Sequence, residues 1–112
     1  MPFWRFHALL VAALMTLPAA SFADDPVAID LRLKDHKFDP SEIRAPAGKA
    51  IAITLKNEDD AVEEFDSSAL RTEKIVTKGG VVTIKLKPLA AGRYPFQGEY
   101  HPNTAQGVLI VE

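Results

Sequence analysis

The chain contains no cysteine and only two methionines, Met1 and Met15. Without cysteine it can form no disulfide and can offer no thiolate to a metal ion. Because both methionines lie within the first fifteen residues, the rest of the chain contains no sulfur atom. Any metal bound there must be held by nitrogen and oxygen atoms, which suit Cu(II), Zn(II), Mn(II) and both oxidation states of iron, with Cu(II) bound tightest.

Long apolar runs and an excess of basic residues are also missing. The longest apolar run, Ala8 to Leu17, is shorter than the roughly 20 residues that span a bilayer, so we expect a protein that is not embedded in the membrane. The formal net charge of -2 does not predict nucleic-acid binding. The sequence also has no Gly-rich phosphate loop and no nucleophile beside a base and an orienting acid, so it does not indicate a hydrolase or transferase.

The first 23 residues are typical of a secretory signal peptide. Arg5 precedes the apolar run, and Ser21-Phe22-Ala23 forms a small-x-small cleavage site. We therefore expect cleavage after Ala23 and export of residues 24–112. Removal of Arg5 leaves 12 basic against 15 acidic residues, a net charge of -3.

Residues 24–112 alternate between short strands and turns. Apolar residues recur at every second position over 27–33, 51–55, 82–86 and 94–96, the pattern of half-buried strands. Further strands are expected over 41–45, 71–76 and 108–111, with Pro or Gly in the turns. About seven strands at this spacing predict an all-β single domain, an antiparallel β-sandwich. Residues 60–70 can hold a turn of helix.

Acidic residues gather in the connection after the strand at 51–55. This connection holds Glu58, Asp59, Asp60, Glu63, Glu64 and Asp66, six acids in nine positions. In an extended chain Glu64 and Asp66 share the face opposite Phe65, and both are candidate metal ligands. The plainer interpretation is a solvated acidic loop, as most charge runs are.

The last loop, residues 98–107, carries the strongest candidate ligand, His101. Glu99 lies two residues earlier, so in an extended loop both side chains project to the same side, and a carboxylate there can orient the imidazole. His36 lies in the loop after the first strand and reaches the same site only if this loop lies at the same end of the sandwich as His101. For each of these residues the alternative is an ordinary exposed loop position.

The whole set of segments resembles the cupredoxins over nearly all of residues 24–112. The resemblance rests on Phe38-x-Pro40, Ile43-x-Ala45-Pro46-Ala47-Gly48, the strand end Leu55-Lys56-Asn57, and Gly92-x-Tyr94-x-Phe96 before a His loop. It implies a Greek-key sandwich with a metal at one end, held in that family by His, Cys, His and Met. Here those positions fall on Glu64, Gly98, His101 and Ala105. Three of the four ligands are missing, so the chain cannot form a blue-copper centre.

The variant loops are similar to those of cupredoxin-like periplasmic proteins of bacterial iron-uptake systems, of the EfeO/FtrB type. These loops are Glu63-Glu64-Phe65-Asp66 and Gly98-Glu99-Tyr100-His101-Pro102. The resemblance implies a periplasmic protein that binds copper(II) or iron through Glu64, Glu99 and His101, with His36 or Asp66 completing the site.

The same resemblance implies hand-over of iron to a membrane permease or another periplasmic iron-uptake partner. The only catalysis that it implies is metal-dependent Fe(II) oxidation. Copper binding or delivery without iron, and a metal-free interaction module on the same scaffold, stay as alternatives. The sequence does not determine the native metal or the oligomeric state.

Overall fold

The computed structural model describes residues 2, 11–15 and 25–112, and all nine of its strands lie within the last range. The predicted signal peptide, residues 1–23, lies mostly outside the described residues and stays a prediction. No helix among the described residues has the length and apolarity needed to cross a membrane.

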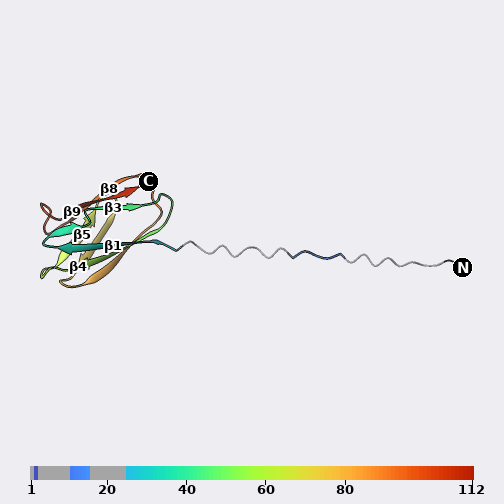
Figure 1. Ribbon diagram of the computed structural model, residues 1–112, viewed down its shortest axis with the longest axis horizontal. Coiled ribbons are helices and arrows are strands. Elements are labelled where there is room, and N and C mark those ends of the chain that lie inside the picture. The colour runs from blue at the N-terminus through green and yellow to red at the C-terminus, as the bar shows by residue number, and fades with distance from the viewer. Residues whose placement is uncertain (1, 3–10, 16–24) are drawn as a thin grey trace.

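The strands form two sheets that pack face to face (Figure 1). The first sheet has the order β2-β1-β4-β7 and consists of β1 (Val27–Lys34), β2 (Lys37–Asp39), β4 (Ile51–Asn57) and β7 (Val81–Leu86). The second has the order β3-β9-β8-β5-β6 and consists of β3 (Glu42–Ala45), β5 (Glu63–Ser67), β6 (Thr72–Val76), β8 (Gly92–Gly98) and β9 (Gln106–Val111).

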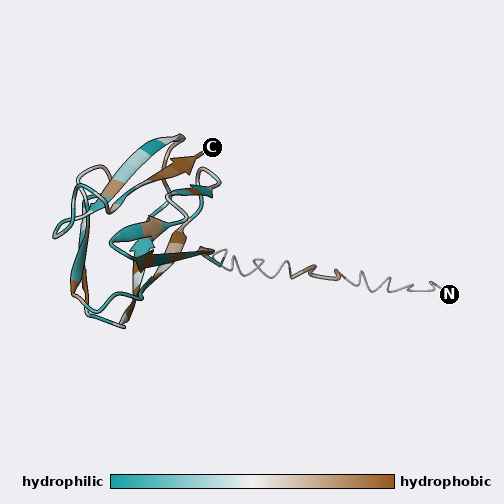
Figure 2. Cartoon of the chain, turned by 60° about the vertical axis from the view of Figure 1, so that its left-hand side comes forward, coloured by the Kyte–Doolittle hydropathy of each residue, from teal (hydrophilic) through white to brown (hydrophobic). Residues whose placement is uncertain are grey.

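The core lies between the sheets because alternate residues of each strand point inward. In β4, for example, Ile51, Ile53 and Leu55 are buried. Phe38 and Phe96 pack edge to face with ring centroids 5.1 Å apart. The ring of Phe96 also stacks on the ring of Phe65 in β5, with centroids 4.9 Å apart. Figure 2 shows the apolar residues on the strands of the sandwich, including β9 at the C-terminus.

The predicted all-β sandwich in a single domain is confirmed, but β2 and β5 were not among the predicted strands and the pairing differs in detail. Strands β1 and β4 pair in parallel, as do β3 and β9, so the sheets are mixed instead of wholly antiparallel. The period-2 pattern shows which face of a strand is buried but carries no information on the direction of its neighbour. A turn of helix was possible within residues 60–70, but residues 63–67 form strand β5 instead.

One end of the sandwich gathers the turns of both sheets. There the β1–β2 turn meets the connection before β5: the N–H of Asp35 donates to Oδ1 of Asp59 at 2.6 Å. The loop between β8 and β9 lies at the same end, because His101 in that loop contacts His36 in the β1–β2 turn. This end, here called the histidine end, brings together both histidines of residues 25–112.

Candidate functional site

Glu63 and His101 form a buried contact at the histidine end. The Glu63 side chain is 1% exposed and that of His101 is 30% exposed, with Nδ1 of the imidazole 2.6 Å from Oε2 of the carboxylate. Oε1 of Glu63 accepts the backbone N–H groups of Glu64 at 3.0 Å and Tyr100 at 2.9 Å. A carboxylate in this position accepts a hydrogen bond from Nδ1–H, so it holds the ring with Nδ1 inward and leaves the Nε2 lone pair free.

The space for the Glu63 carboxylate exists because residue 98 is glycine. A Cβ atom on Gly98 would lie 2.7 Å from Cδ of Glu63 and 2.7 Å from Cβ of Ala105. Both distances are far shorter than van der Waals contact. The β8 glycine and the small, fully buried Ala105 therefore make room for an acidic side chain inside the sandwich.

A blue-copper centre does not fit these residues. Of the positions to which the cupredoxin resemblance assigns the copper ligands, Gly98, His101 and Ala105 meet here, whereas Glu64 lies on the other face of β5. A cysteine at position 98 would collide with Glu63, because the added Cβ already does. With neither thiolate nor thioether, the set lacks the ligands that define such a centre.

Glu63, and not Glu64, occupies the position opposite His101. The burial of β5 alternates, with Glu63, Phe65 and Ser67 inside and Glu64 and Asp66 on the outer face. A shift of one residue along a strand moves a side chain to the other face of the sheet. The alignment with Glu64 therefore put the carboxylate on the wrong side of the sheet.

Glu64, Asp66 and Glu99 lie together on the outer face of the second sheet. The pKa of Glu99 is raised, first by its hydrogen bond with Asp66, then by the charge of Asp66 and by the charges of Glu64 and Glu73. The pKa of Tyr100 is also raised, chiefly by desolvation and then by the charge of Glu64. These carboxylates form a negatively charged surface beside the histidine end.

Glu99 and His101 do not project to the same side, contrary to the expectation for an extended loop. The N–H of Glu99 donates to the carbonyl of Glu64 at 2.8 Å and continues the sheet, whereas the N–H of His101 donates to the carbonyl of Gly98 at 3.1 Å. The second of these hydrogen bonds closes a turn. The turn carries His101 inward, toward Glu63, and leaves Glu99 outside.

His36 lies face to face with His101. The two imidazole rings are stacked, with centroids 3.7 Å apart and planes 14° from parallel. The condition that the β1–β2 turn lies at the same end as the last loop is therefore met. Nδ1 of His36 lies 3.5 Å from Oδ2 of Asp59, and the His36 side chain is 43% exposed.

Asp59 holds the turn that presents His36. Its Oδ1 accepts the N–H of Asp35 at 2.6 Å and its Oδ2 accepts the N–H of His36 at 2.9 Å. The N–H of Asp59 donates in turn to Oδ1 of Asn57 at 3.0 Å, a side chain that is completely buried. A chain of hydrogen bonds thus runs from the core to the second histidine.

The sequence interpretation missed Glu63 and Asp59 as functional residues. Glu63 stands two positions before Phe65, so the period-2 pattern that buries the phenylalanine also buries the acid. That signal was present but was outweighed by the number of acids nearby. Asp59 has no comparable signal, because its hydrogen-bond partners at 35 and 36 are distant in sequence.

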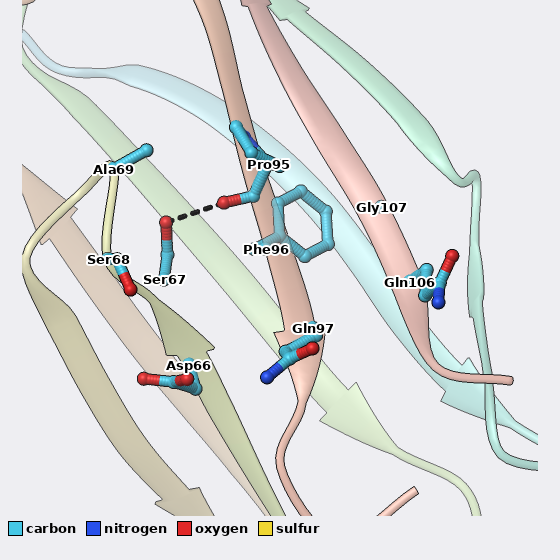
Figure 3. A pocket seen from close by; sticks show the side chains of 9 residues that line it. All are labelled: Asp66, Ser67, Ser68, Ala69, Pro95, Phe96, Gln97, Gln106 and Gly107. Carbon is cyan, nitrogen blue, oxygen red and sulfur yellow. Dashed lines mark hydrogen bonds between the residues drawn. The ribbon is translucent and has the colours of Figure 1, made fainter. Parts of the chain in front are cut away.

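A pocket of about 340 Å³ opens on the outer face of the second sheet, where β5 and β8 separate (Figure 3). These strands pair at only two positions, and beyond them the hydroxyl of Ser67 donates to the carbonyl of Pro95 at 2.7 Å. Asp66 and Gln97 line the pocket, but neither candidate histidine does. Asp66 therefore faces this separate pocket and not the histidine end.

Within the described part of the chain, no group of three or more His, Asp or Glu side chains is arranged to hold a metal ion. The histidine end offers two imidazole rings and one oriented carboxylate. Such an end can take an ion that fills its remaining coordination positions with water, because Cu(II) and iron accept nitrogen, oxygen and water ligands.

Comparison with solved structures shows the same fold in proteins that bind copper. Auracyanin A, a blue copper protein of Chloroflexus aurantiacus, superposes with a TM-score of 0.67 at 18% identity, over 79% of this chain and 100% of that one. The metal-binding domain of the Cu(I)-exporting P-type ATPase CopA of Streptococcus pneumoniae D39 gives 0.65 at 16% identity, over 76% and 84%. Identities this low show a shared fold.

Sequence comparison gives the family. The uncharacterized protein RP394 of Rickettsia prowazekii (strain Madrid E) is 40% identical over 88 residues, which cover 79% of this chain and 70% of that protein. A family model described as a cupredoxin-like domain matches residues 6–111. The chain therefore belongs to the family of cupredoxin-like domains.

Proposed function

We propose that this protein is exported to the periplasm, where it binds a copper or iron ion at the histidine end in the service of iron uptake. The observation that carries the proposal is the 2.6 Å contact between Nδ1 of His101 and Oε2 of Glu63. Metal-binding imidazoles commonly donate the other ring N–H to a carboxylate in this way. Because the His101 side chain is 30% exposed, an ion can reach it from solvent.

The charge around the histidine end favours oxidised ions. Glu64 and Glu99 lie on the adjoining outer face, and their negative charge stabilises Fe(III) and Cu(II) relative to the less highly charged Fe(II) and Cu(I). This environment suits a protein that accepts an ion, or assists Fe(II) oxidation, and then hands the ion on. Hand-over to a membrane permease rests on the resemblance of the two loops to iron-uptake proteins, whereas the solved neighbours support copper.

Metal titration tests the proposal. Wild-type protein and His101→Ala are titrated anaerobically with Cu(II) and with Fe(II), and thermal unfolding and metal content are measured. Because a ligand that binds only the folded state raises its stability, wild type should show saturable stabilisation, and His101→Ala should bind at least tenfold more weakly. Asn103→Ala, an exposed position in the same loop, is the control. Unchanged affinity in His101→Ala would refute the assignment.

A second experiment separates iron uptake from copper delivery. A strain lacking the protein is grown with limiting iron and, in parallel, with limiting copper. A growth defect under iron limitation alone supports the proposed role. A defect under copper limitation alone favours copper delivery.

A metal-free interaction module is the second candidate, and one observation favours it. The Glu63 carboxylate fills the interior position beside Gly98 and is satisfied by three donors, so the fold is complete without an ion there. For this candidate the melting temperature should be the same with every divalent ion tried.

A further inference from the structure

We propose that His36 is the second nitrogen ligand of this site and that the ion bound by the His36–His101 pair is Cu(II). This inference rests on the proposed function, because it names the ion and a further ligand of the same site. It departs from the ligand arrangement described for the family above, since His36 lies in the β1–β2 turn. The site it describes opens outward, above the buried Glu63.

Both imidazoles face a carboxylate with the same ring nitrogen. Nδ1 of His101 contacts Glu63 at 2.6 Å, and Nδ1 of His36 lies 3.5 Å from Asp59. Among the described residues, no hydrogen bond involves Nε2 of either ring. The hydrogen bond to Glu63 keeps the ring proton of His101 on Nδ1 and leaves its Nε2 free to bind a metal, and the longer approach of Asp59 favours the same tautomer in His36. The stacked rings therefore offer two nitrogen ligands on neighbouring side chains.

The backbone at His36 has a conformation in which glycine is the favoured residue. Asp35 and His36 have φ angles of 53° and 56°, the left-handed conformation of both central residues in a type I′ hairpin turn. Glycine is the favoured residue at the second of these positions, because a Cβ atom is strained there. Strained residues of this kind gather at functional sites, and His36 stands where the turn itself favours glycine.

The two rings differ in their freedom to move. Their planes lie 14° from parallel, so one ring must pivot before both Nε2 atoms can bind one ion. His101 is fixed by its short contact with Glu63. His36 can pivot, because its side chain is 43% exposed and its 3.5 Å approach to Asp59 is longer than a normal hydrogen bond.

The donor set selects the ion. Two imidazoles without thiolate or thioether bind Cu(II) more tightly than Fe(II), Mn(II) or Zn(II) in the general affinity order, and they hold Cu(I) poorly. Fe(III) would favour the carboxylates of the outer face, of which none contacts the stacked rings among the described residues. Cu(II) also accepts water in its remaining positions, and the exposed side of the rings leaves room for it.

Pulsed electron paramagnetic resonance of the Cu(II) complex tests the assignment, because it counts bound imidazoles. The full chain carries His7→Gln in every sample, so that His36 and His101 are its only histidines. The parent protein, which keeps both His36 and His101, should show two imidazoles bound to Cu(II). The His36→Gly variant should show one, and its affinity for Cu(II) should be at least tenfold lower. Glycine suits the left-handed turn, so this variant should fold. His36→Asn, whose side chain also tolerates that conformation, should lose affinity equally.

The outcomes separate the two proposals. One imidazole in the parent protein, or equal Cu(II) affinity in folded His36→Gly, would overturn the role of His36 while leaving metal binding by His101 intact. Preference for iron over Cu(II) in competition would overturn the choice of ion alone. No stabilisation by copper or iron in any sample would refute the proposed function and this inference together.

Discussion

Replacing Glu63 by Gln changes one oxygen to nitrogen at the centre of the site and leaves the side-chain shape the same. Oε1 accepts two backbone N–H groups, so the Gln carbonyl oxygen must stay in that position. Its NH2 group then points at Nδ1 of His101, where the carboxylate oxygen was. An amide N–H needs an acceptor, so Nδ1 must give up its proton and Nε2 must carry it. The variant therefore blocks the nitrogen that we expect to bind metal.

The transfer of the ring proton from Nδ1 to Nε2 should change both the metal affinity and the stability of the protein. Metal affinity should fall about 10–100-fold, the usual effect of removing the carboxylate that orients a ligating histidine. Stability should fall by about 1–2 kcal/mol, because a hydrogen bond to a charged group contributes about 1.5–3 kcal/mol and a neutral one about 1 kcal/mol. In a domain of this size, each 1 kcal/mol lowers the melting temperature by roughly 4–8 °C.

The assay combines Cu(II) titration, thermal unfolding and nitrogen NMR of His101, which reports its tautomer directly. Glu64→Gln is the matched control, since it makes the same chemical change one residue along β5 on the outer face, and it should alter stability by less than about 0.5 kcal/mol. If folded Glu63→Gln keeps the wild-type tautomer and the wild-type Cu(II) affinity, the reasoning is refuted.

Three further predictions concern packing, backbone strain and pH. Gly98→Ala should destabilise the fold by about 1–3 kcal/mol, because its methyl group overlaps buried atoms. In the same strand, a Cβ atom added at Gly92 would lie no closer than 3.6 Å to its neighbours. Gly92→Ala should therefore lower the free energy of unfolding by less than Gly98→Ala, as measured by chemical denaturation. Since both variants lack the imidazole, His36→Ala should be about 1 kcal/mol less stable than His36→Gly, the cost of a Cβ in the left-handed region; equal stabilities would contradict that strain. The pKa of Glu99 is raised above its ordinary 4.5 by Asp66, so the folded state holds the proton more tightly than the unfolded state. Wild type should therefore lose stability relative to Glu99→Gln as pH rises from 4.5 through the raised pKa, and parallel melting curves from acid to neutral pH would refute the shift.

The alternating pattern predicted the strands well because burial on one face is a local property of the chain. Val27–Lys34 and Ile51–Asn57 were recognisable as strands from their own residues. Their parallel pairing was not, because strand direction depends on where the chain crosses between sheets. Strand β5 was missed because its two inward acidic and hydroxyl side chains, Glu63 and Ser67, lack the apolar alternation on which the prediction depends.

The candidate site was predicted in part. His101 and His36 were both named from the sequence, and the structure brings their rings to 3.7 Å. Glu64, Asp66 and Glu99 were named with them but lie on the outer face, because a one-residue shift in β5 and a turn after Glu99 reverse their directions. A list of acidic residues does not show which of them enters the sandwich.

The sequence by itself determined the donor chemistry of this protein. A chain without cysteine, and without methionine beyond residue 15, cannot offer a sulfur ligand in its folded domain, whatever its conformation. Only the tertiary structure decided which nitrogen and oxygen atoms meet. The contact of Glu63 with His101 spans 38 positions, and the contact of His36 with Asp59 spans 23. Such contacts exist only because the two sheets pack and bring distant turns to one end.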